Sequence, residues 1–381
     1  MPVSLCSHLD RDARPCGRTL QCANPSPACL ERAGKTLNIG LINNMPDAAL
    51  LATERQFVSL LEAASHGIDV RLHRYSMPHI PRGATVAGSV EEHFSGVDRM
   101  LDTQLDALIM TGREPSAASL AEEPDWDEFT RIVEWARKNT LSAIWSCLAA
   151  HAAVLHLDNV ARRRRDRKYT GVFASSRIDD HFLMAGVPAQ LRLPHSRWNG
   201  VSEQDLRDAG YTVLTRSDLA GVDIFVKQTG SLFVFFQGHP EYEAITISLE
   251  YRRDALRFLR GESERWPSLP HAYFDQETVA ALTVIEHEAL HFPNKDLAER
   301  LCTILETVRP EHSWRSTAVH LAGNWLRYIV ATKRLNLLAD ASVTAAGRTN
   351  ALPEIHASGL PSVAQPANTA SAASRAILTI L

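Results

Sequence analysis

The stretch SAIWSCLAAHAAVLHL, residues 142–157, passes from an apolar run through a single cysteine into a second apolar segment. Residues from Leu141 to Ser146 favour a buried strand, and those from Leu148 to Leu157 favour a helix. Cys147 is therefore expected on a sharp turn at a helix N-terminus, where backbone N–H groups favour a thiolate and can bind an oxyanion. The alternative for this residue is a buried, inert thiol.

Other apolar runs alternate with helix-like segments along the chain. Short apolar runs rich in β-branched residues occur at Leu37–Ile42, Ala107–Met110 and Leu232–Phe236. Amphipathic patterns predict helices at Ala48–Ala63 and Asp127–Arg137. Such alternation predicts an α/β fold with a mostly parallel sheet flanked by helices.

Composition narrows the function classes. The 381 residues are 45% hydrophobic and carry a formal net charge of −4, which is typical of a globular protein and gives no basic surface for nucleic acid. No run of apolar residues is long enough to cross a membrane, and the first residues do not form a signal peptide. We expect a cytoplasmic protein that acts on small molecules, without nucleic-acid or membrane partners.

The two ends of the chain differ in composition from the middle. Residues 1–36 lack apolar periodicity, and the C-terminal segment from about residue 340 is rich in Ala, Ser, Thr and Pro. We predict disordered tails at residues 1–36 and 336–381 around one domain, residues 37–335. The first tail holds four cysteines with no zinc-binding spacing, which we interpret as reduced thiols: Cys6, Cys16, Cys22 and Cys29.

A second chemical motif lies in FVFFQGHPEY, residues 233–242. An apolar strand breaks at Gly238, and the loop that follows presents His239 and Glu241, at the strand end where α/β proteins place their sites. A nucleophilic cysteine needs a base and a third group that orients the base. The sequence therefore predicts the triad Cys147, His239 and Glu241.

Dispersed motifs extend this pattern. They are Ile42-Asn43-Asn44-Met45-Pro46, Thr111-Gly112, Cys147, Lys168-Tyr169-Thr170-Gly171-Val172, Pro194-His195-Ser196-Arg197, Gly238-His239-Pro240-Glu241-Tyr242, Arg253-Asp254, Ser313-Trp314-Arg315-Ser316 and Asn324-Trp325. With them, residues 36–333 resemble the homoserine O-acyltransferases, the O-succinyl- and O-acetyltransferases of the class I glutamine amidotransferase-like (flavodoxin-like) fold.

The resemblance implies a mechanism and a site. Cys147 would carry the acyl group as a thioester, His239 would accept the proton, and Glu241 would orient His239. Lys168, Ser196 and Arg253 match the family's substrate-binding positions. The implied partners are acyl-CoA as co-substrate and L-homoserine, with no further cofactor, a role in methionine biosynthesis, and a homodimer.

Departures from the family concern the acyl group. Leu148 stands where the family commonly has Trp, and Ser116 aligns with the position that separates succinyl from acetyl users. Ser116 is small and neutral, and Arg113 is a candidate partner for a succinyl carboxylate, so succinyl-CoA is favoured over acetyl-CoA. The alternative for Arg113 is an exposed loop arginine.

Two further motifs have ordinary explanations. A helical insertion is predicted at about residues 277–308, and it contains the zinc-type string His287-Glu288-Ala289-Leu290-His291 with Glu299, Glu306 or Glu311 as third ligand. We favour a surface helix, with no metal. The basic run from Arg162 to Lys168 is either a solvated face or a contact for CoA phosphates, and we favour the former.

Three rival functions stay open at this point. A glutamine amidotransferase-like hydrolase would use the same cysteine and His-Pro-Glu loop, but such enzymes normally carry glycines around the nucleophile, where this chain has Ser146 and Leu148. An acyltransferase could act on another hydroxyl amino acid such as serine. A non-catalytic amino-acid binder would not need an intact triad.

Overall fold

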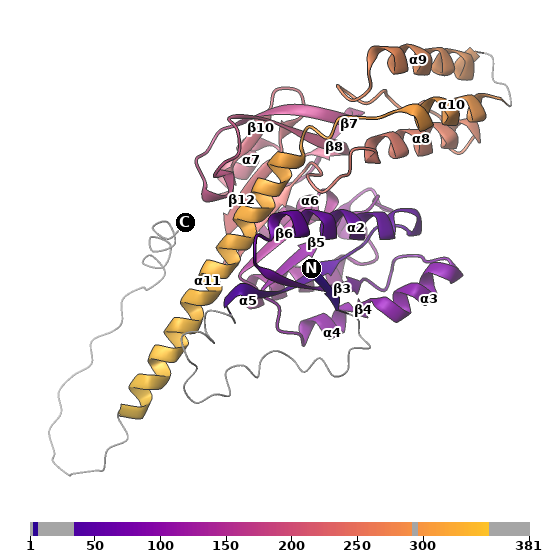
Figure 1. Ribbon diagram of the computed structural model, residues 1–381. Coiled ribbons are helices and arrows are strands. Elements are labelled where there is room, and N and C mark those ends of the chain that lie inside the picture. The colour runs from indigo at the N-terminus through magenta and orange to yellow at the C-terminus, as the bar shows by residue number, and fades with distance from the viewer. Residues whose placement is uncertain (1–2, 7–33, 292–295, 350–381) are drawn as a thin grey trace, which may run out of the picture.

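The computed structural model describes residues 3–6, 34–291 and 296–349. A nine-stranded sheet with the strand order β1-β3-β2-β5-β6-β13-β12-β9 lies at its centre, and β4 also pairs with β3 (Figure 1). Its strands are β1 (Val3–Cys6), β2 (Thr36–Ile42), β3 (Asp69–Ser76), β4 (Ser95–Gly96), β5 (Ala107–Met110), β6 (Ser142–Ser146), β9 (Thr212–Val213), β12 (Ile224–Gln228) and β13 (Leu232–Phe236). The pairs from β1 to β13 are parallel, and β12 and β9 add two antiparallel strands. The expected α/β class with a mostly parallel sheet is confirmed.

Helices cover both faces of this sheet. Helices α2 (Asp47–Ala64) and α11 (Arg315–Thr349) pack on one face, and α5 (Trp126–Asn139) and α6 (Leu148–Asp158) on the other. Adjacent strand residues alternate between the two cores: Ile144 of β6 packs in the first, and Trp145 in the second. This period of two buries both faces of the parallel strands. Short helices α3 (Ala84–His93) and α4 (Val97–Leu101) and the 3₁₀ turn η2 (Leu120–Glu122) complete this half.

A second, antiparallel sheet stands beside the first, and we did not predict it. Its order is β11-β10-β7-β8, with β7 (Arg163–Arg177), β8 (Gln190–Gly200), β10 (Thr215–Ser217) and β11 (Gly221–Val222), and η3 (Phe182–Met184) and α7 (Glu203–Asp208) join its strands. The start of β7 is the arginine-rich run, which lacks the apolar alternation that signals a strand. Strand β8 touches the main sheet's loops through the Pro194 carbonyl, which accepts the His239 N–H at 2.8 Å.

Three helices form a separate layer at one end of the molecule (Figure 1). They are α8 (Thr246–Leu259), α9 (Gln276–His291) and α10 (Leu297–Thr307), and they share a small apolar core that includes Tyr251, Ile285 and Leu301. Helices α9 and α10 occupy the segment where the sequence analysis places a helical insertion.

The ends of the chain differ from the predicted boundaries at two points. Residues Val3–Cys6, predicted to be disordered, form strand β1, because β3 offers a free edge and Val3 is buried there. Helix α11 extends past residue 336 to Thr349, because its alanines are strong helix formers. The rest of both predicted tails, with Cys16, Cys22 and Cys29, lies outside the described residues. Within the described ranges, no helix combines the length and apolar character needed to span a membrane.

Candidate active site

Cys147 lies between β6 and α6 in a conformation that L-residues rarely adopt, with φ 53° and ψ −110°. Its N–H donates to the Phe236 carbonyl of β13 at 2.7 Å, which fixes the elbow to the neighbouring strand. A Cβ added to Gly112 would lie 2.6 Å from the Leu148 nitrogen, so only glycine lets the chain after β5 pass so close to the first turn of α6. The elbow therefore combines a half-buried thiol with closely packed backbone at a helix N-terminus.

His239 and Glu241 lie on the loop after β13. The Nδ1 atom of His239 and Oε1 of Glu241 are 2.9 Å apart, and Glu241 is only 4% exposed. The His239 ring stacks on Tyr242 with ring centroids 4.2 Å apart. A carboxylate at Nδ1 leaves Nε2 as the nitrogen available to a reacting group.

The protonation of His239 is coupled to both of its partners. Burial would lower the pKa of His239, but the charges of Glu241 and Cys147 and the hydrogen bond with Glu241 raise that pKa well above its ordinary value. The charge on His239 therefore depends on both Glu241 and Cys147. Cys147, His239 and Glu241 are thus brought together as predicted, while their catalytic roles stay predictions.

Buried polar residues hold this loop in place: Asp223, which the sequence did not reveal, and His195 and Arg197, to which it assigned no role. The Gly238 N–H donates to Oδ1 of Asp223 at 2.8 Å, and Asp223 faces His195 across 3.3 Å, both fully buried. Arg197 donates from Nε to Nδ1 of His195. Burial would raise the pKa of Asp223, but His195, the Gly238 N–H and Arg197 lower it. The Asp223 carboxylate therefore stabilises the loop by accepting the Gly238 N–H in a buried site next to two further polar side chains, and no local sequence pattern identifies it.

A second buried contact links the elbow helix to the same loop. His151 on α6 lies 2.9 Å from Oε1 of Gln237, whose Nε2 donates to the Val222 carbonyl. Burial lowers the pKa of His151 to about 3, so its imidazole is neutral at physiological pH. The helix that begins at Cys147 and the loop that carries His239 are therefore tied by uncharged hydrogen bonds.

The three predicted substrate-binding residues lie on β7, β8 and α8. Lys168 donates to Oδ2 of Asp254 at 2.9 Å, and Arg253 donates to Oδ1 of the same carboxylate at 2.8 Å. Burial would raise the pKa of Asp254, but these two cations lower it. Ser196 lies half-buried opposite Thr170 in the β7–β8 ladder, and Arg197 follows it. Asp254 thus joins Lys168 and Arg253 into one charged group.

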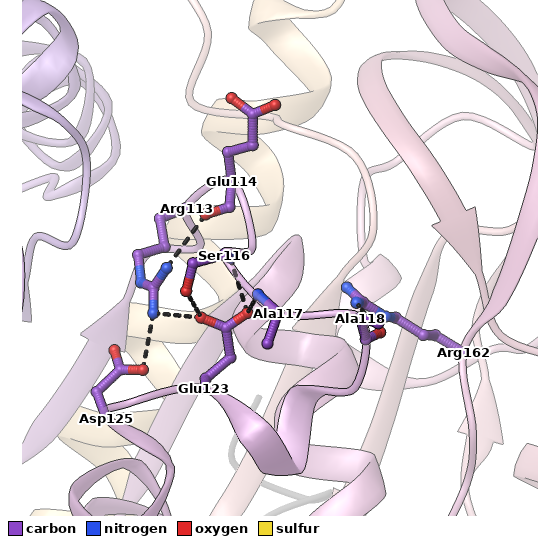
Figure 2. Close-up of polar contacts among 8 residues, drawn as sticks. All are labelled: Arg113, Glu114, Ser116, Ala117, Ala118, Glu123, Asp125 and Arg162. Atoms are coloured by element: carbon purple, nitrogen blue, oxygen red, sulfur yellow. Dashed lines mark hydrogen bonds and ion pairs between the residues drawn. The ribbon is translucent and has the colours of Figure 1, made fainter.

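The loop with Ser116 and Arg113 is folded around one carboxylate (Figure 2). Glu123 accepts bonds from the N–H groups of Ser116 and Ala117, from the Ser116 hydroxyl and from Nη2 of Arg113, at 2.7 to 2.8 Å. Arg113 also donates to Asp125 at 2.8 Å. The predicted candidate partner of an acyl carboxylate is therefore already paired with two carboxylates of its own loop, because Glu123 and Asp125 fold back onto it.

The zinc-type string is part of helix α9. The rings of His287 and His291 stack with centroids 4.5 Å apart, and Glu288 forms a bidentate ion pair with Arg300 of α10. Among the described residues, no three His, Cys, Asp or Glu side chains are grouped as metal ligands. Glu288 would have to leave Arg300 to activate a zinc-bound water.

An α/β sheet that presents a cysteine on a strand-to-helix elbow beside a histidine–glutamate pair defines a class of proteins equipped for thiol-based acyl chemistry. The chain belongs to the homoserine O-succinyltransferase family, whose model matches residues 22–335.

Individual relatives agree with this assignment. A homoserine O-succinyltransferase of Rhodopseudomonas palustris is 45% identical over 294 residues, which cover 77% of this chain and 88% of the relative. One of Bradyrhizobium japonicum is also 45% identical over 294 residues, covering 77% of this chain and 90% of the relative. Among solved structures, the glutamine amido transferase from Methylobacillus flagellatus is 16% identical with a TM-score of 0.43, over 77% of this chain and 95% of that one.

Proposed function

We propose that this chain is an acyltransferase that moves a succinyl group from succinyl-CoA to the hydroxyl of L-homoserine, through a thioester on Cys147, in methionine biosynthesis. Support comes above all from the elbow cysteine beside the His239–Glu241 pair in a chain that is 45% identical to two homoserine O-succinyltransferases. Acyl-CoA is the co-substrate, with no other cofactor. We further propose that the protein is a cytoplasmic homodimer.

The first half of the reaction forms the thioester. The Cys147 thiolate attacks the carbonyl of acyl-CoA, and the oxyanion meets backbone N–H groups of the first turn of α6, beginning with Leu148, beside the closely packed Gly112. The C–S bond to CoA then breaks, and the protonated His239 gives its proton to the leaving CoA thiolate. The products are acyl-Cys147, a neutral His239 and free CoA.

Acylation itself prepares His239 for the second half. The charge of Cys147 is one of the causes that raise the pKa of His239, and this charge disappears when the sulfur carries an acyl group. The pKa of His239 then falls, so the neutral imidazole can take the proton of the acceptor hydroxyl. The alkoxide oxygen attacks the thioester, Cys147 leaves as a thiolate, and the thiolate–imidazolium pair is restored.

The charged group around Asp254 suits an amino-acid acceptor. Lys168 and Arg253 offer cations to the acceptor's carboxylate, and Asp254 offers a carboxylate to its ammonium group. Ser196 supplies a hydroxyl on the adjacent strand. Homoserine and serine share these two charged groups and differ by one methylene between them and the hydroxyl, so they are the acceptors to compare.

Intact-protein and peptide mass spectrometry tests this function. Mixing the protein with succinyl-CoA should give an acyl adduct on Cys147 that disappears when L-homoserine is added, faster than with L-serine. A glutamyl adduct after mixing with glutamine would instead support an amide hydrolase. Absence of an adduct with both succinyl-CoA and acetyl-CoA would contradict the proposal.

A further inference from the structure

The charged groups of the Ser116 loop are largely paired with one another within the loop. Each oxygen of Glu123 accepts two hydrogen bonds, and Arg113 divides its guanidinium between Glu123, Asp125 and the Glu114 carbonyl. A guanidinium that already faces two carboxylates gains little from a third anion. Arg113 is therefore a structural member of the loop, and a carboxylate-bearing acyl group needs another cation.

Arg162 approaches the Ser116 loop from the side opposite Arg113 (Figure 2). It lies between α6 and β7, and its Nη2 atom donates to the Ala118 carbonyl at 3.3 Å. Its Nη1 atom is buried, and within the described part of the chain no acceptor lies within hydrogen-bonding distance of it. Glu123 is the nearby carboxylate, but its oxygens are already occupied by the loop. A buried guanidinium N–H without an acceptor is unfavourable, and an incoming carboxylate would satisfy it.

The charge environment places Arg162 near the nucleophile. Burial lowers the pKa of Arg162, whereas the charges of Glu123 and Cys147 raise it and that of Arg164 lowers it. Arg162 is thus within electrostatic reach of Cys147 while it touches the loop that holds Ser116. An acyl group on Cys147 that extends toward this loop would bring its far end to Arg162.

We infer that Arg162 determines donor specificity by binding the terminal carboxylate of a dicarboxylic acyl group such as succinyl, through its unpaired Nη1. This inference rests on the proposed acyl transfer. A succinyl group adds a bidentate or charge-assisted contact that an acetyl group cannot make, so Arg162 contributes to one donor and not to the other.

The test compares donors in four purified proteins: wild type, Arg162→Ala, Arg162→Lys and the matched control Arg163→Ala. Arg163 is the next residue, but it is 66% exposed and pairs with Asp205. Rates of Cys147 acylation are measured with succinyl-CoA and acetyl-CoA by mass spectrometry. We expect Arg162→Ala to lower the succinyl-to-acetyl ratio by about 10- to 100-fold, as for the loss of a charged hydrogen bond. Arg162→Lys should recover part of the ratio, and Arg163→Ala should keep it.

Each other outcome is decisive. An equal loss with both donors in Arg162→Ala would assign Arg162 to the thiolate or to the fold and overturn the inference, as would an unchanged ratio. If the alanine variant does not fold, Arg162→Lys carries the test, because a lysine cannot reproduce the guanidinium's paired donors and the ratio should still fall. A wild type that is acylated by neither donor overturns the proposed function as well, whereas a wild type that prefers succinyl-CoA with an unchanged variant ratio overturns only the role of Arg162.

Discussion

The Cys147 centre and the Ser116 loop are both rich in buried polar groups, but they use them differently. Around Cys147, groups from β6, β8 and the loop after β13 converge from distant parts of the sequence, and the Cys147 thiol is only half-buried. In the Ser116 loop, donors and acceptors within thirteen residues satisfy one another. Polar groups that converge from distant segments around an accessible reactive atom are typical of a catalytic site. Polar groups that bond only one another within a single loop are typical of structural support.

The largest effect that would test this difference between the two regions is expected from a substitution of Cys147. Cys147→Ser should lower kcat/KM for succinyl transfer by about 10⁴-fold or more, because a hydroxyl beside His239 is a far weaker nucleophile than a thiolate. Steady-state kinetics measure the loss. Cys302→Ser, which changes a half-buried cysteine of α10, should leave the rate intact. Transfer within tenfold of wild type in Cys147→Ser would show that the open thiol is not the nucleophile.

Glu241→Gln should reduce kcat by about 10²-fold, because the carboxylate that orients His239 and favours its protonated form is lost. The control is Glu243→Gln, an exposed glutamate of the same loop.

The same substitution has a pH signature. The folded-state pKa of His239 is raised above its unfolded value of 6.5, so its stabilising effect is complete below that pH and is lost as pH rises through the folded pKa. The difference in unfolding free energy between wild type and Glu241→Gln should therefore be largest below pH 6.5 and shrink in alkali, as urea denaturation across pH will measure. A difference that grows with pH would contradict the role of Glu241.

Glu123→Gln should lower stability rather than chemistry. It removes the charge that balances Arg113, and we expect a loss of about 2 kcal/mol in unfolding free energy at neutral pH. Burial would raise the pKa of Glu123, but bonds from Ala117, Ser116 and Arg113 lower it. The loss should therefore diminish as pH falls through the folded pKa of Glu123. Glu122→Gln, at an exposed neighbour, is the control, and a Glu123 variant with native stability would show that the closed loop is not a support.

The smallest effect is expected on α9. His291→Ala should change the unfolding free energy by less than about 0.5 kcal/mol and leave acyl transfer unchanged, because it is an exposed position whose neighbour Glu288 is paired with Arg300. Calorimetry and metal analysis check this. Stoichiometric zinc that is lost in His287→Ala would instead establish a metal site.

The parts that the sequence predicted are those with a local signal. A strand, a turn and a helix within residues 142–157 are enough to locate Cys147, and the break at Gly238 is enough to locate His239 and Glu241. The parallel order of the central strands follows from their alternation with helices.

The parts that were missed depend on contacts between distant residues. Nothing near Asp223 in the sequence reveals that its carboxylate accepts the Gly238 N–H and faces His195 in a fully buried site. Likewise, the state of Arg113 is decided by Glu123 and Asp125, which are ten and twelve residues away and face it only after the chain turns through η2. Strand β7 was missed because its first residues are charged and show no apolar alternation. Its pairing with β8, a contact between distant residues, stabilises the strand instead.

The backbone of Cys147 carries a consequence for how this protein can evolve. A cysteine held at φ 53° and ψ −110° stores conformational strain that glycine would not feel. Cys147→Gly should therefore produce a catalytically dead protein that melts at a higher temperature than the working one. If Cys147 is the nucleophile that we propose, the strained elbow is a site where activity is kept at the expense of thermal stability.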